Sequence, residues 1–145
     1  MAAPTPTTHV QWDGTQGYLY WRAEWTDGTQ LTDSILVDVS DTATFPVPGA
    51  ATRLNSVKVI GIECQCNGDL EATLEFDATT DQLIDVFEGQ TDSTIVFSED
   101  YTNLPSGGRV PNTTAAGFVG DILLTTVNAA NGDELKLKIL FRRKT

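Results

Sequence analysis

Hydrophobic and polar residues alternate with a period of two along most of this chain. The segment 70–77 (LEATLEFD) places an apolar residue at every second position, and the segment 135–143 (LKLKILFRR) does so up to Phe141, with Lys136 and Lys138 in between. The aromatic run 17–25 (GYLYWRAEW) has Tyr18 and Tyr20 on one side and Trp21 on the other. Such alternation is typical of β-strands that bury one face. No segment keeps an apolar period of 3.6 residues, so we expect little helix.

Turn residues separate these runs. Asn-Gly-Asp at 67–69 is the strongest hairpin signal of the chain, and it predicts a tight turn between a strand over 54–66 and a strand over 70–77. Two further short strands are expected at 82–89 and 93–100. A long loop over 102–116, rich in Gly, Pro and Asn, then leads into a strand over 117–127.

Eight or so short strands joined by polar turns indicate an all-β, antiparallel β-sandwich. The preferred architecture is an eight-stranded jelly roll, and the alternative is an immunoglobulin-like sandwich, whose Cys…Trp…Cys spacing is missing here. Residues 1–16 are expected to form an extended N-terminal arm, because the chain begins with a Pro- and Thr-rich run. A single sandwich domain is expected over 17–145, since 145 residues suffice for one buried core.

The net charge of −11 argues against attraction of the whole surface to nucleic acid or to an anionic membrane. No apolar run approaches the ~20 residues that cross a bilayer, and the first residues do not resemble a secretory signal. We therefore predict neither a nucleic-acid nor a membrane partner. The end of the chain differs, because residues 135–145 carry five basic side chains and no acid. This asymmetry suggests docking onto an acidic partner or, alternatively, a sheet edge with balanced charge.

Residues suited to catalysis are sparse. His9 is the single histidine and lies in the expected arm, and no glycine motif for binding phosphate is present. Carboxylates are abundant, but no pair stands out as an acid and a base. Asp77, Asp81 and Asp85 offer oxygen ligands for Ca²⁺ but do not match the EF-hand spacing. The sequence thus predicts no catalytic residue, no cofactor, no metal site and no enzymatic activity.

The two cysteines, Cys64 and Cys66, are two residues apart on an expected strand. They would point to the same side with Cα atoms roughly 6.5–7 Å apart, which is poor geometry for a disulfide. We predict buried free thiols, which fits synthesis under reducing conditions.

Aromatic residues are enriched in protein interfaces, and the long loop and the basic C-terminal end are further candidate contacts. The candidate partner contacts are therefore Trp12, Trp21, Trp25, Arg109, Arg142, Arg143 and Lys144. Flat aromatic rings on a sandwich also suit stacking on sugars. The alternative is that these rings anchor the first strand or pack against a neighbouring subunit.

Three segments carry a resemblance to a known family: DGTQLTDSILVDVS, LEFDATTDQLIDVFEG and GFVGDILLTTVNAANGDELKLKI. Over residues 26–142 the chain resembles the head decoration (cement) proteins of tailed bacteriophages. The shared pieces are structural signatures rather than active-site motifs.

The resemblance implies a non-enzymatic virion protein on the outside of an icosahedral capsid. It would bind the major capsid protein lattice and stabilise it, form a homo-oligomer (dimer or trimer), and be synthesised in the cytoplasm of the bacterial host. The alternative is a receptor- or glycan-binding β-sandwich on a phage tail or fibre.

Overall fold

The computed structural model describes residues 4–12, 16–39 and 57–143, and within them it contains strands and no helix. No helix with the length and apolarity to cross a bilayer is therefore found in these residues. The strands are β1 (Thr7–Trp12), β2 (Gln16–Glu24), β3 (Ser34–Val37), β4 (Val57–Phe76), β5 (Gln82–Asp100), β6 (Ile122–Val127) and β7 (Glu134–Arg143).

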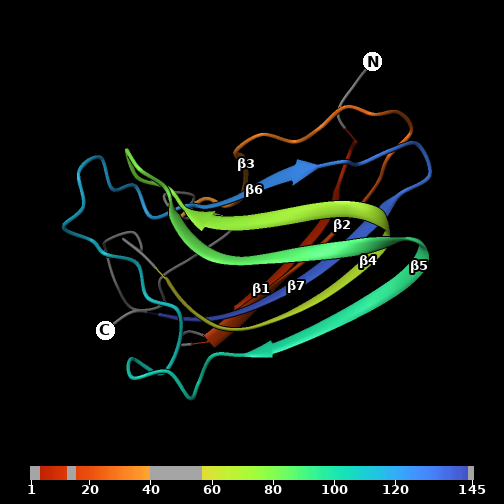
Figure 1. Cartoon of the computed structure of the whole chain (residues 1–145). Coiled ribbons are helices and arrows are strands. Elements are labelled where there is room, and N and C mark those ends of the chain that lie inside the picture. Colours follow the sequence, from red (N-terminus) through yellow and green to blue (C-terminus); the bar gives the residue numbers. More distant parts are fainter. Residues whose placement is uncertain (1–3, 13–15, 40–56, 144–145) are drawn as a thin grey trace.

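All pairings between these strands are antiparallel, and the sheet order is β1-β2-β7-β4-β6-β3, with β5 along the other side of β4. The first half of β4 pairs with β7, and its second half pairs with β6. The sheet curls at this point into two layers, as the bent ribbons of β4 and β5 show (Figure 1). The β2 layer contains β1, β2, β7 and the adjoining halves of β4 and β5, and the β6 layer contains β3, β6 and the other two halves. The prediction of an antiparallel all-β sandwich is confirmed.

One local prediction was wrong. The Asn-Gly-Asp segment at 67–69 does not close a hairpin, because β4 runs through it and is 20 residues long. Gly68 does adopt the positive φ of 98° that the sequence indicated, but this backbone angle produces a bend. The expected strands over 82–89 and 93–100 are likewise joined into β5, where Asp92 (φ 58°) lies at an irregularity in the register. The described strands therefore number seven, and not eight.

The imperfect alternation of the first half of β4 has a structural cause. The register of β4 with β7 shifts between Val59 and Gly61, so that one residue is inserted there. Before this β-bulge Val59 points into the core, and after it Ile62 and Cys64 do so. A bulge of this kind reverses the side to which odd- and even-numbered residues point.

The core lies between the two layers. On β7 and on the second half of β4, the apolar residues of the alternating pattern point inward as predicted, and all are at most 2% exposed. These are Leu70, Ala72, Leu74, Phe76, Leu135, Leu137, Ile139 and Phe141.

Residues 7–12 of the expected N-terminal arm form β1, which pairs with β2 from Thr7 to Trp12. The loop predicted over 102–116 is confirmed, but it continues to residue 121, and the strand expected over 117–127 begins only at Ile122. Backbone hydrogen bonds hold this loop to β4 and to the residue that follows it. The amide of Arg109 donates to the carbonyl oxygen of Val59 at 2.8 Å, and the amide of Val119 donates to that of Asp77 at 3.0 Å.

The tight bend should make the stability of the protein sensitive to replacement of Gly89 by a larger residue. A Cβ atom on Gly89 would lie 2.2 Å from the carbonyl oxygen of Gly68, so one backbone must move. We expect Gly89→Ala to lower the free energy of unfolding by about 2–3 kcal/mol, in the range of other overpacked sites. Urea denaturation followed by tryptophan fluorescence measures this. Gly28→Ala is the control, since its new Cβ meets no atom closer than 3.9 Å. Equal losses in both variants would contradict the tight bend.

Candidate partner-binding surfaces

Two of the tryptophans predicted as partner contacts lie in the core. Trp21 is 4% exposed and Trp25 is 1% exposed. The indole N–H of Trp25 donates to the carbonyl oxygen of Thr29 at 2.9 Å, which ties the turn after β2 to the core. Tyr20 points outward from the same strand and is 48% exposed. In this conformation the two tryptophans anchor β2 and are not accessible to a partner.

The remaining predicted contacts lie only partly within the described residues. The backbone of Trp12 pairs with Gly17 at the end of β1, and Arg142 is exposed near the end of β7. The side chains of Trp12 and Arg143 and the whole of Lys144 lie outside the described part of the chain.

Lys58, Arg109 and Arg142 lie at the same end of the β2 layer, and we call these three residues the basic end. Lys58 is paired across the strands with Arg142. Arg109 forms a bridge with Val59, the residue next to Lys58. The Lys58 ammonium also donates to the carbonyl oxygen of Ser106 at 3.2 Å. The fold thus brings the long loop next to the basic C-terminal part of β7, and these two features are separate in the sequence.

The position of Arg109 is supported by aromatic packing. Its guanidinium carbon lies 5.2 Å from the centre of the Tyr101 ring, within the range of a cation–π contact. The Tyr101 hydroxyl donates a hydrogen bond to the Asp85 carboxylate. Burial of Tyr101 and this hydrogen bond raise the pKa of its hydroxyl, so that it stays a neutral donor. The loop therefore holds Arg109 at the surface in a defined place.

The outer face of the β2 layer combines aromatic and basic side chains. The Lys138 ammonium lies 5.3 Å from the centre of the Tyr18 ring and 5.9 Å from that of Tyr20. Arg22 and Glu134 form an ion pair at 2.6 Å, which raises the pKa of the guanidinium and lowers the pKa of the carboxyl.

A groove of about 330 Å³ crosses this face between β2 and β5. Its polar and aromatic lining includes Tyr20, Glu63, Gln65, Ser98, Lys136 and Lys138. The groove offers a ring, two ammonium groups, a carboxylate and neutral hydrogen-bonding groups to a ligand.

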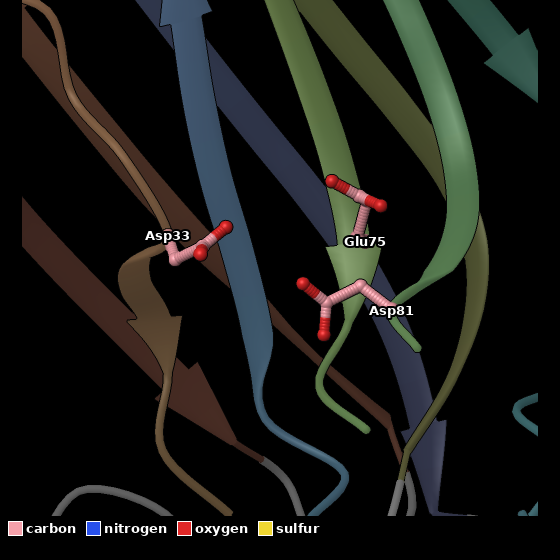
Figure 2. Close-up of side chains that lie close together, drawn as sticks. All are labelled: Asp33, Glu75 and Asp81. Atoms are coloured by element: carbon pink, nitrogen blue, oxygen red, sulfur yellow. The ribbon is translucent and has the colours of Figure 1, made fainter. Parts of the chain in front are cut away.

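The β6 layer is negatively charged, whereas the outer face of the β2 layer carries basic side chains. The strand segments of the β6 layer contain acids but no lysine or arginine. Carboxylate oxygens of Asp33, Glu75 and Asp81 lie within 4.8 Å of one another. The three side chains come together from the start of β3, the end of β4 and the turn after β4 (Figure 2). Carboxylate oxygens are ligands that Ca²⁺ accepts, so this is where the described residues could hold a hard cation.

This cluster differs from the set of aspartates that the sequence suggested as oxygen ligands. Asp81 belongs to it, whereas Asp85 accepts the hydrogen bond of Tyr101. Asp33 belongs to the cluster only because β3, β6 and β4 are neighbours in the sheet. The spacing of residues along the sequence does not reveal this neighbourhood. Burial, and then repulsion from Asp81 and Asp33, raises the pKa values of Glu75 and Asp77.

The prediction of buried free thiols is confirmed. Cys64 and Cys66 are 1% and 0% exposed, and neither is in a disulfide. Their sulfur atoms lie 3.6 Å apart, because both side chains point from one strand into the core.

Comparisons with known proteins do not assign a family. No protein-family model matches the chain, and no curated protein matches it. Among solved structures, the chain is similar to the coat protein dimer of Tobacco streak virus, with 10% sequence identity over 93% of this chain and 89% of that one and a TM-score of 0.36. A TM-score of this size does not establish a common fold or function.

The acidic cluster predicts that Glu75→Gln stabilises the protein at neutral pH. The folded-state pKa of Glu75 is raised, so its charged form is less favourable in the folded state than in the unfolded one. We expect a gain in the free energy of unfolding of a few tenths to about 1 kcal/mol at pH 7, because solvent screens this partly exposed site. The gain should disappear as the pH falls below the unfolded pKa of Glu75, where both variants are neutral.

Urea denaturation at pH 7 and at about pH 4 measures the difference. Glu24→Gln is the matched control, because it removes the same charge from an exposed strand position outside the cluster. If Glu75→Gln is no more stable than Glu24→Gln at pH 7, repulsion in the cluster is absent.

Proposed function

We propose that this chain is a structural, non-enzymatic protein of a bacteriophage particle that binds the outside of the capsid. Its partner would be the lattice of the major capsid protein, to which it would add as a homo-oligomer, a dimer or a trimer. The resemblance of residues 26–142 to head decoration proteins suggests this role. Binding that favours the assembled shell over its dissociated subunits would stabilise the shell by mass action.

The observation that carries the proposal is the basic end. Arg109 and Arg142 are exposed, and Lys58 beside them is bonded to the long loop. A protein with a net charge of −11 is repelled by an acidic surface unless one part of it presents cations. The basic end supplies such a part and orients the molecule. Repetition on a lattice then lets weak single contacts act together.

The proposal predicts that Arg109→Glu/Arg142→Glu weakens binding to matching capsids that lack this protein. We expect the double variant to lose at least about tenfold in affinity, because both contacts become repulsive. Co-sedimentation of purified protein with the capsids, at low and at physiological salt, measures binding. Lys136→Glu/Lys138→Glu is the matched control, since it changes the net charge equally in the middle of the sheet. Wild-type protein that does not bind the capsids would end the proposal.

A second candidate function is glycan binding by a tail- or fibre-associated module. The groove on the outer face of the β2 layer favours it, because exposed Tyr20 is flanked there by hydrogen-bonding side chains. An aromatic ring beside polar groups suits stacking and hydrogen bonding to a sugar. The buried Trp21 and Trp25 do not contribute to such a platform.

This candidate predicts saturable binding on a glycan array that Tyr20→Ala abolishes. Tyr20→Phe keeps the ring and should retain most of the affinity, which separates stacking from a folding defect. A wild-type protein that binds no glycan on the array removes this candidate and leaves the capsid proposal untouched.

A further inference from the structure

Among the described residues, strand β5 is a long edge of the sheet that is free on one side. It is 19 residues long and pairs with β4, and no other described strand pairs with it. It belongs to both layers and follows the bend of β4 along one side of the molecule (Figure 1). The N–H and C=O groups on its other side are a template for an additional strand, and proteins usually shorten or cover such edges.

Apolar side chains remain uncovered along residues 94–100 of this edge. Val96 is 69% exposed, the highest value among the large apolar residues of the described chain. Its neighbours Ile95 and Phe97 are only partly buried, although Phe97 packs against Phe87 with ring centres 5.3 Å apart. A strand added here would cover Val96 on the outer side and Phe97 on the inner side.

The charge of the edge selects its partner. β5 contains five acidic residues and no basic one. Glu99 and Asp100 lie within the uncovered segment, and the Asp100 carboxylate accepts hydrogen bonds from Thr102 that lower its pKa and keep it ionised. Pairing with β5 of a second copy would bring acids but no cation to the new interface, so neither Glu99 nor Asp100 would gain an opposite charge. A segment with lysine or arginine is favoured.

We propose that residues 94–100 of β5 bind an extended, basic segment of another protein by strand addition. The segment would alternate Lys or Arg with β-branched apolar residues. Its backbone would bond to the free edge. Its apolar side chains would cover Val96 with its cations on the side of Glu99, or cover Phe97 with its cations on the side of Asp100. This surface lies beside the basic end, because Arg109 stacks on Tyr101, the residue after Asp100. It consists of other residues, so the inference does not rest on the capsid proposal.

A synthetic peptide of about seven residues that alternates Val with Lys tests this proposal, because it matches the length of the uncovered segment. Fluorescence anisotropy with the full chain should show saturable binding. Methylating every second amide nitrogen keeps the charge of the peptide but removes the N–H donors along one of its two edges. There are two such peptides, and the one whose methylated edge faces β5 should bind at least about tenfold more weakly. A Val–Glu peptide should not bind.

Variants of the chain complete the test. Adjacent residues of a strand direct their N–H groups to opposite edges, so one of Ile95 and Val96 directs its N–H group toward β4 and the other toward the free edge. Proline at the second of these positions removes only an N–H group of the free edge. That variant should keep its fold by circular dichroism and lose peptide binding. Arg109→Glu/Arg142→Glu should bind the peptide at least as tightly as wild type, because it replaces a cation beside the acidic end of the strand with an acid. The opposite effect on capsid binding separates this result from the capsid experiment.

Two outcomes would overturn the proposal. Equal affinity for the plain peptide and both N-methylated peptides would show that only charge attracts it. Dimerisation of the chain that the same proline variant abolishes would assign the edge to a second copy instead.

Discussion

The close approach of two backbones at Gly68 and Gly89 is the constraint on which the rest of the structure depends. The β4–β5 hairpin must bend there so that one pair of strands belongs to both layers. A Cβ atom on Gly89 would collide with the carbonyl oxygen of Gly68, so glycine is needed for the strands to stay paired through the bend. Without the bend, the apolar faces of the two halves of β4 would not face each other across a core.

The bend also determines where the charges lie. Because the inner faces of both layers are apolar, the charged side chains of the strands lie on the outer faces, the ends and the edges. Asp121, just before β6, is buried and accepts a hydrogen bond from the amide of Val39. The alternating lysines of β7 then belong to one layer and the acids of β4, near Asp33 and Asp81, to the other. The free edge of β5 runs past both layers. Each surface proposed to bind a partner is therefore a consequence of how the sheet curls.

Much of the candidate surface could not be read from local patterns. Alternation correctly separated Tyr20 from Trp21, but both sides of β2 are aromatic, so the pattern did not decide which ring is buried. Asp33 and Glu75 meet through β6, and Arg109 meets Lys58 through a bridge from a loop. These are long-range pairings, and the sequence contains no periodic signal that encodes them.

By itself, the sequence determined the all-β class, the inward faces of β7 and of the second half of β4, and the buried free thiols. The physical reason is that a period of two is a local property of a strand with one dry face. Only the tertiary structure decided that Asn-Gly-Asp bends a strand instead of reversing it, and that β5 is one long edge. A glycine with positive φ allows either outcome, and the packing of the two layers against each other selects between them.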